Sequence, residues 1–434
     1  MDKPQMTLAE KILALKSGKE SVRAGEFVEA EADLTVTNDT SGHILVRSFR
    51  QIENLKIWDP DKFVICLDHL APANNPQTAI NHNLVREFVR EHGIKHFYDV
   101  NEGIHLQVPV EKGLVLPGML IPGNDSHCTM FGALGAFGTG VSIGETLELL
   151  AFGKLWFKVP SSIQFDISGD LPEMVTAKDI ALDVICRLES DEGIYKALEF
   201  TGTGIRSLNI DGRLTLCNLA VEMGAKIGII EPDDITADYL KGRSERRYPM
   251  IKSDPHADFE RIVHIDATGL SPKISLPHSV DNVTDVSKVH GVKINQGFIG
   301  SCTNGRFSDL ATAAEILQGR SVHPSARLII NPASKEVYLK ALNEGILNIL
   351  VTSGAVVCNP GCGACIGATK GVIGDGEICI SSANRNFRGR MGSDKAEIYL
   401  ASPATVAASA VTGEITDPRH FIVPFGEWEK NPRL

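Results

Sequence analysis

Four cysteines in two separate stretches of the sequence could hold a metal centre. Cys358, Cys362 and Cys365 stand close together before Gly367, and Cys302 lies earlier in the chain. Three thiolates could bind an iron–sulfur cluster and leave one iron without a protein ligand. An iron of this kind can take up water or a substrate oxygen and act as a Lewis acid, whereas four thiolate ligands close the cluster and suit electron transfer. The cysteines therefore raise the question of what binds at the fourth iron.

Zinc and radical chemistry are the two competing interpretations of these cysteines. A Cys-x-x-Cys pair is a common half of a zinc site, and structural zinc would need Cys358 as a fourth thiolate. The spacing Cys358-x3-Cys362-x2-Cys365 also matches that of radical enzymes that bind S-adenosylmethionine. Against that class, Ala364 stands where those enzymes usually carry an aromatic residue, and the motif lies near the C-terminus. The radical-enzyme interpretation is therefore disfavoured, and zinc stays open on the cysteines alone.

Two pairings of aspartate with histidine could supply proton transfer beside a metal. Asp68-His69 follows Phe63–Leu67, a continuous apolar run of strand length, and Asp125-Ser126-His127 lies in a loop. Such a run is typical of a parallel strand covered on both faces, and open α/β sheets bind ligands at the carboxyl ends of these strands. A neighbouring aspartate can hold an imidazole protonated near neutrality. An isolated Asp-His dipeptide is usually structural, so both pairings gain weight only from the cysteines.

The elements that would position these residues alternate between strands and helices. A capping box at Thr7–Glu10 starts a helix that runs up to Gly18. Further helices are expected at residues 81–92, 175–188 and 214–223, and further strands at 197–200, 227–230 and 292–299. The glycines between 132 and 140 lack the G-x-G-x-x-G spacing of a dinucleotide site. This alternation predicts an α/β protein.

Composition and charge narrow the class of protein. A chain of 434 residues, at roughly 150 residues per domain, is long enough for about three domains, and 43% hydrophobic residues is a globular value. A net charge of −11 argues against a nucleic-acid or anionic-membrane partner. No secretory leader and no apolar run of membrane-spanning length is found. Nine cysteines, an odd number in a long chain, predict a reducing cytoplasmic location with thiols available for metal.

Five ordered motifs resemble those of the aconitase superfamily and, within it, the large subunits of the 3-isopropylmalate dehydratase type. The resemblance covers nearly the whole chain, and its motifs are Asp68-His69, Asp125-Ser126-His127, Gly300-Ser301-Cys302-Thr303-Asn304, Pro360–Cys365 and Ser381–Gly392. It implies an α/β fold of three domains, at residues 1–155, 156–285 and 286–434, around a [4Fe–4S] cluster. It also implies that Cys302, Cys362 and Cys365 bind this cluster and that Cys358 does not.

The same resemblance implies roles for the remaining site residues. Asp68 would orient His69, which would give a proton to the departing hydroxyl group, and Asp125 and His127 would form a second acid–imidazole group with Glu199 as the remote partner. The residues implied in substrate binding are Ser126, Asn384, Arg385 and Arg390. Guanidinium groups suit carboxylates because they bind them bidentately. The implied reaction is the dehydration, hydration or isomerisation of a small 2-hydroxy dicarboxylic acid.

Two departures from the family pattern bear on the substrate. Many large subunits carry a histidine at the position of Leu106, directly after His105, and another where this chain has Asn38. It is therefore open whether His105 reaches the site. Changes near a substrate pocket indicate a different substrate, so 2,3-dimethylmalate and homoaconitase-type substrates stand as alternatives to 3-isopropylmalate.

The resemblance also implies a protein partner. One-chain aconitases carry a further swivelling domain with a serine base, and this chain ends soon after Arg419. A separate small subunit is therefore expected to supply that domain and the base in a hetero-oligomer. Two other classes are disfavoured. An RNA-binding regulator would need clustered lysine and arginine, and an electron-transfer protein would need four cysteine ligands.

Overall fold

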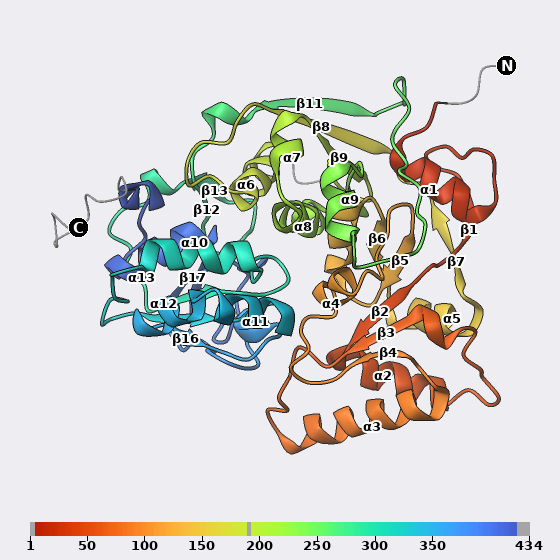
Figure 1. Ribbon diagram of the computed structural model, residues 1–434, viewed down its shortest axis with the longest axis horizontal. Coiled ribbons are helices and arrows are strands. Elements are labelled where there is room, and N and C mark those ends of the chain that lie inside the picture. Colours follow the sequence, from red (N-terminus) through yellow and green to blue (C-terminus); the bar gives the residue numbers. More distant parts are fainter. Residues whose placement is uncertain (1–4, 189–191, 423–434) are drawn as a thin grey trace.

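A computed structural model describes residues 5–188 and 192–422 of the chain. Residues 1–4, 189–191 and 423–434 lie outside this description. The prediction that the chain has no leader concerns residues 1–6, so most of it falls on residues that are not described. Within the described part, three larger sheets and one two-stranded ribbon carry the fold (Figure 1). Mixed sheets and helices agree with the predicted α/β class.

The first sheet is parallel and carries both Asp-His motifs at its edge. Its strands, in spatial order, are β4 (His96–Tyr98), β3 (Phe63–Cys66), β2 (Thr35–Asn38), β5 (Leu120–Gly123) and β6 (Phe137–Gly140). The helices around it are α2 (Asp39–Arg50), α3 (Pro76–His92), the short α4 (Gln107–Glu111) and α5 (Ile143–Phe152). The predicted strand at 63–67 is therefore β3, and the predicted helix at 81–92 is α3, which begins earlier because Asn75 caps it.

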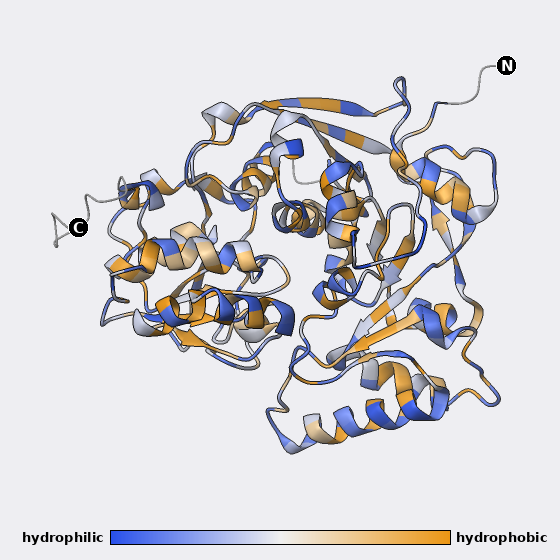
Figure 2. Ribbon diagram, in the orientation of Figure 1, coloured by the Kyte–Doolittle hydropathy of each residue, from blue (hydrophilic) through white to orange (hydrophobic). Residues whose placement is uncertain are grey.

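The burial of each element shows which of its faces packs in the core. All four residues of β3 are buried, as expected for a parallel strand covered on both faces. Helix α3 buries Val85 and Phe88 against the sheet and turns a largely hydrophilic face outward (Figure 2). The N-terminal helix α1 (Leu8–Ser17) has the predicted capping box of Thr7 and Glu10 and ends at Gly18, whose φ of 68° suits a left-handed cap.

The second sheet is also parallel, in the order β10 (Ile227–Ile230), β9 (Ala197–Thr201), β8 (Ser162–Ser168) and β11 (Arg261–Asp266). Its helices are α6 (Ala177–Arg187), α7 (Thr203–Ser207), α8 (Ile210–Asn218) and α9 (Asp234–Leu240). The helix predicted at 214–223 is α8 followed by the 3-10 helix η3 (Leu219–Met223). One apolar core joins this sheet to the first, since Val64 of β3 and Phe165 of β8 belong to the same buried cluster.

The third sheet carries the cysteine and arginine motifs. Its order is β13 (Val283–Asp285), β12 (Lys273–Ser275), β18 (Glu397–Ala401), β17 (Ile378–Ser381), β14 (Gln296–Ile299), β15 (Arg327–Ile330) and β16 (Val356–Val357). Strand β12 is antiparallel to both of its neighbours. The helices are α10 (Phe307–Leu317), α11 (Lys335–Asn343), α12 (Ile346–Thr352) and α13 (Pro403–Thr412).

The predicted domain limits can be compared with the positions of the sheet strands. The strands of the first and second sheets fall inside the predicted ranges 1–155 and 156–285, and β12 and β13, from the end of the second range, pair into the third sheet. The ribbon of β1 (Phe27–Glu31) and β7 (Lys154–Lys158) bridges the first limit. The three domain ranges stay a prediction. Among the described helices, none combines the length and the apolar character needed to cross a bilayer.

Candidate functional site

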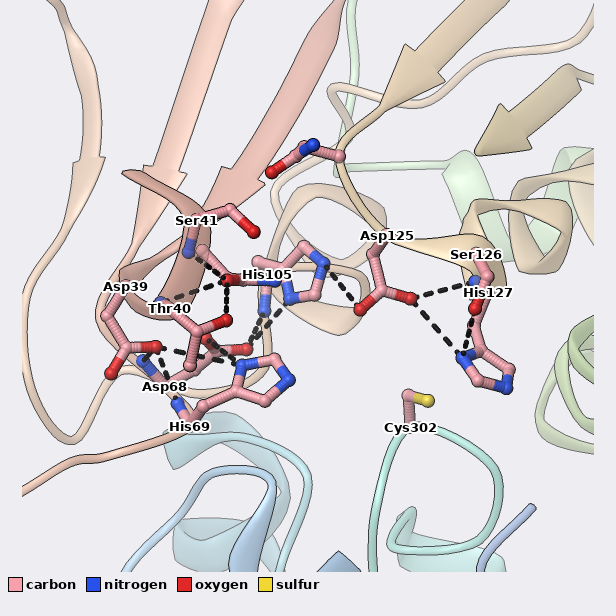
Figure 3. A network of polar contacts seen from close by, with 12 residues as sticks. Asp39, Thr40, Ser41, Asp68, His69, His105, Asp125, Ser126, His127 and Cys302 are labelled. Atoms are coloured by element: carbon pink, nitrogen blue, oxygen red, sulfur yellow. Dashed lines mark hydrogen bonds and ion pairs between the residues drawn. The ribbon is translucent and has the colours of Figure 1, made fainter. Parts of the chain in front are cut away.

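The candidate site lies where the carboxyl ends of β3 and β5 meet the cysteine loops of the third sheet. Asp68 follows β3 and Asp125 follows β5, and both strands are parallel neighbours of β2. Figure 3 shows the residues of both Asp-His motifs in one polar network, with His105 between them. The Cys302 thiol lies next to this network, below Asp125 and His127 in the view. The structure thus brings both Asp-His motifs to the same edge of the first sheet.

Asp68 is the centre of the first half of this network. Its Oδ1 atom lies 2.9 Å from Nδ1 of His69, and its Oδ2 atom lies 2.8 Å from both the main-chain nitrogen and Nδ1 of His105. Burial disfavours a charged imidazole, but the charge of Asp68 and its hydrogen bond outweigh burial and raise the pKa of His69 to about 10. The imidazolium of His69 is thus available as a proton donor at neutral pH.

Asp39 holds the main chain of this motif in place. The buried carboxylate of Asp39 accepts hydrogen bonds from the main-chain nitrogens of His69 (2.9 Å) and Leu70 (2.8 Å), and it lies 3.2 Å from Nε2 of His82. These bonds fix the direction in which the imidazole of His69 leaves the chain. Sequence reasoning noticed the segment Thr37–Asp39 only as a departure from the family and did not identify Asp39 as a support.

His105 connects the two halves of the network. Besides its contacts with Asp68, its Nε2 atom lies 3.8 Å from Oδ2 of Asp125, and its ring centroid lies 5.6 Å from that of His69. His105 is 1% exposed, and its Nε2 atom has no hydrogen-bond partner among the described residues. His105 therefore reaches the site, which the sequence had left open.

Asp125 and His127 form the second half, with a carboxylate partner that was not predicted. Asp125 accepts from the main-chain nitrogen of His127 at 2.8 Å and lies 3.3 Å from its Nδ1 atom. On the other side of the ring, Nε2 of His127 lies 2.9 Å from Oε1 of Glu222, in η3. Burial opposes the charged ring, but the hydrogen bonds to Asp125 and Glu222 raise the pKa of His127.

Glu222 takes the place that sequence reasoning gave to Glu199. Glu199 lies on β9, and its carboxylate accepts from the Ser253 hydroxyl at 2.7 and 2.8 Å. Burial raises the pKa of Glu199 to about 7. The structure does not bring Glu199 to His127, so the pairing of these two residues was wrong. No pattern in a single sequence distinguishes Glu222 as the partner.

The predicted substrate-binding residues divide between the network and the thiols. Nη2 of Arg385 donates to the Ser126 hydroxyl at 3.0 Å, and Nε of Arg385 lies 2.9 Å from Glu222. The side chain of Arg385 is 27% exposed, so part of its guanidinium can take a ligand carboxylate. Arg390 instead donates from Nη2 to Sγ of Cys365 at 3.4 Å.

The three predicted cluster thiols converge, and two of them, those of Cys302 and Cys365, accept from side-chain nitrogens. Cys302, Cys362 and Cys365 are all buried. The sulfur of Cys302 accepts from the side-chain amides of Asn218 (3.2 Å) and Asn384 (3.6 Å). Amide and guanidinium donors are the partners that thiolate ligands of a cluster take. The residues present therefore fit an iron–sulfur cluster.

The separation of the thiols bears on the choice between zinc and an iron–sulfur cluster. Metal ligands come from His, Cys, Asp and Glu side chains. In the described part of the chain, one group of three such residues has its ligand atoms all within 4.8 Å of one another, and this group is Asp68, His69 and His105. Tetrahedral zinc would bring sulfur ligands to about 3.8 Å from one another. Cys302, Cys362 and Cys365 do not all lie within 4.8 Å of one another, although Cys362 and Cys365 interact directly. Asp68, His69 and His105 are already joined by hydrogen bonds.

Cys358 and Gly361 define the loop around the cluster position. The thiol of Cys358 is half-buried near Lys370 and packs against the apolar cluster that contains Cys362 and Cys365. Gly361 has a φ of 140°, and a Cβ atom there would lie 2.6 Å from the Asp68 carbonyl oxygen. The next residue, Cys362, donates its main-chain nitrogen to the same oxygen at 3.0 Å. The cysteine loop thus packs directly on the Asp68-His69 motif.

Comparison with known proteins decides the family. The chain matches the Aconitase family (aconitate hydratase) over residues 10–291 and 285–413. The chain belongs to the aconitase family. It is 48% identical over 413 residues to a probable 3-isopropylmalate dehydratase large subunit of Methanothermobacter thermautotrophicus, with 95% of this chain and 99% of that protein covered.

Two further relatives show how close the neighbouring activities lie. A 3-isopropylmalate dehydratase large subunit of Methanopyrus kandleri is 47% identical, over 96% of this chain and 99% of that protein. A probable methanogen homoaconitase large subunit of M. thermautotrophicus is 44% identical, over 96% of this chain and 98% of that protein. The predicted family and the predicted class of enzyme, a hydro-lyase, are confirmed. Membership of the aconitase family also implies an iron–sulfur cluster.

Proposed function

We propose that the chain is the large subunit of an iron–sulfur hydro-lyase that acts on 3-isopropylmalate. The observation that carries the proposal is that Cys302, Cys362 and Cys365 converge, joined by Asn384 and by the contact between Cys362 and Cys365, beside the Asp68-His69 pair. Several relatives are named 3-isopropylmalate dehydratase large subunits. Homoaconitase is the second candidate, because relatives with that name are 44% and 48% identical.

The cofactor is proposed to be a [4Fe–4S] cluster held by Cys302, Cys362 and Cys365. When bound, such a cluster supplies one iron without a protein ligand, which serves as a Lewis acid toward a hydroxyl group. Hydroxide is a poor leaving group, so its departure from a hydroxy acid also needs a proton. The chain's own residues provide that proton and hold the substrate.

His69 is the proton donor in this proposal. Its Nδ1 atom is engaged by Asp68, so Nε2 is the atom that can give a proton to the departing hydroxyl. A pKa near 10 keeps the ring protonated at neutral pH, and Asp68 stabilises the ring before and after the transfer. His127, held between Asp125 and Glu222, is the second imidazole that faces the same space.

Arg385 and Ser126 are proposed to bind a substrate carboxylate. Their mutual hydrogen bond of 3.0 Å and the partial exposure of Arg385 present a guanidinium and a hydroxyl side by side. Asn384, fixed between the thiols of Cys302 and Cys365, lies next to Arg385 and orients it toward the cluster position. Arg390 donates a hydrogen bond to the sulfur of Cys365, so its main proposed role is to support the cluster, and substrate binding is its secondary role.

The base that removes the carbon-bound proton is proposed to come from a small subunit that carries the swivelling domain. The relatives are named large subunits, which supports a separate small one. The proposed location is the cytoplasm, where thiols stay reduced.

Reconstitution tests this proposal. The chain is purified without oxygen, its cluster is rebuilt, and a small subunit from the same organism is added. Turnover is then measured with 3-isopropylmalate, homocitrate and 2,3-dimethylmalate. We expect kcat/KM for 3-isopropylmalate to exceed the others by about 100-fold. A preference for homocitrate or dimethylmalate would reject the substrate, and full activity without the small subunit would reject the partner.

A further inference from the structure

Lys178 is a fully buried cation that has no part in the chemistry proposed above. It lies in the first turn of α6 and is 0% exposed. Its Nζ atom donates to the main-chain oxygens of Ala383 (2.5 Å) and Ser382 (3.2 Å). Among the described residues, no carboxylate forms an ion pair with it. An ammonium group in such a place is costly unless its surroundings compensate the charge.

The two carbonyl groups that Lys178 holds belong to the loop between β17 and β18. The following residue, Asn384, contacts the sulfur atoms of Cys302 (3.6 Å) and Cys365 (3.7 Å). Arg385 comes next and reaches Ser126 and Glu222. Lys178 thus fixes the main chain immediately before the two side chains that join the cluster thiols to the substrate-binding group.

The charges around Lys178 explain why a lysine is tolerated at this position. Burial lowers the pKa of Lys178 to about 8, and the negative groups that oppose this effect include Glu222 and Cys365. Both belong to the site, and thiolate ligands of a cluster add negative charge there. A position needed only for core packing would be filled at lower cost by an apolar side chain.

We propose that Lys178 is a positioning residue of the site, whose ammonium group fixes the main chain at Ser382 and Ala383 and so sets Asn384 and Arg385 against the cluster thiols and the substrate carboxylate. The part that concerns the substrate rests on the proposed function. The part that concerns the loop rests on the contacts of Lys178 alone.

Hydrogen–deuterium exchange tests the loop directly. In the full chain without a cluster, the amides of residues 381–390 should exchange about tenfold faster in K178M than in the wild type, because the loop has lost one of its anchors. The matched control is K273M. Lys273 also contacts α6, through Asp183 at 3.2 Å, and its ion pairs among the described residues are with Asp183 and Asp285, which lie outside this loop. K273M should leave the exchange of residues 381–390 unchanged.

Kinetics and cluster content test the consequence for the site. In the reconstituted complex, K178M should bind as much iron as the wild type, raise KM about tenfold and lower kcat. K178Q should recover part of the loss, because its amide can donate to one carbonyl group. If K178M does not fold, K178Q is measured in its place and should show the same changes in smaller degree.

The proposal is overturned if the variants lower the melting temperature but keep the wild-type exchange of residues 381–390 and the wild-type KM. That result would make Lys178 a residue of fold stability only. If the wild-type complex turns over none of the three acids, the proposed function fails, and the exchange experiment still decides the role of Lys178.

Discussion

Nε2 of His127 lies 2.9 Å from Oε1 of Glu222, although the two residues are 95 positions apart in the chain. The same carboxylate oxygen lies 2.9 Å from Nε of Arg385. Glu222 therefore joins an imidazole of the acid–base network to the arginine proposed to hold the substrate. Burial disfavours its charge, but the hydrogen bond from His127 and the nearby Arg385 lower the pKa of Glu222.

Neutralising Glu222 should damage catalysis. In E222Q the pairing with His127 and Arg385 loses its charge, so we expect kcat of the reconstituted complex to fall by about 100-fold. The control is E199Q, because Glu199 contacts Ser253 and not the imidazole. Steady-state kinetics on both variants decide the matter. Equal losses in E199Q and E222Q would contradict the assignment of Glu222.

Removing the charge of Asp68 should disable His69 and His105 together. In D68N one side-chain oxygen remains to serve two imidazoles, and His69 loses the carboxylate that does most to keep it protonated. We expect kcat to fall by about 100-fold or more with cluster iron unchanged, as measured by kinetics and iron analysis. D61N, which breaks only the exposed ion pair with Lys95, should be near wild type. Wild-type kcat in D68N would show that this pair takes no part.

Glu111 gives a pH-dependent stability that can be checked without activity. Burial raises the pKa of Glu111 from its ordinary 4.5 to about 7. Between these values the unfolded chain loses the proton while the folded chain keeps it, so the folded state loses stability as pH rises, by about 3 kcal/mol in total. E111Q keeps an oxygen for Ser334 and Gln107 and removes this loss.

Urea unfolding of the full chain at several pH values measures this effect. E111Q should match the wild type near pH 4.5 and be more stable at pH 8. The control is E336Q, since Glu336 is more exposed and paired with Arg243. A stability difference between E111Q and the wild type that is the same at every pH would contradict the expectation.

The cysteines should separate into ligands and bystanders. Serine at Cys302, Cys362 or Cys365 should cut the iron bound per chain and abolish turnover, because each sulfur holds one iron of the cluster. Serine at Cys358 should leave iron content and kcat close to wild type, since Cys358 is not one of the three proposed ligands. Iron and sulfide analysis after reconstitution provides the measurement. Loss of the cluster in C358S would contradict this division and indicate that Cys358 is a fourth thiolate ligand.

Local patterns predicted the parts of the site that follow regular strands or ordered motifs. The apolar run at Phe63–Leu67 predicted β3 and placed Asp68 at a sheet edge, and the structure brings Asp125 to the same edge. The motif Gly300–Asn304 around Cys302 was likewise recognisable from the sequence alone. These features depend on residues close together in sequence.

Contacts across long separations were out of reach. Glu222 sits in a 3-10 helix and becomes a partner of His127 only through packing of η3 beside η2 (Ser126–Leu134). Asp39 supports residues about thirty positions later, and Lys178 meets a carbonyl group 205 positions later. The sequence around a buried charged residue does not show which distant residue will be its partner.

Mössbauer spectroscopy of the 57Fe-loaded complex tests the central claim, that three cysteines hold a cluster with one iron open to substrate. We predict about four irons per chain, one of which changes its spectrum when 3-isopropylmalate is added while the others stay as they were. Four irons that all remain unchanged, in a complex that is saturated with substrate, would contradict the account.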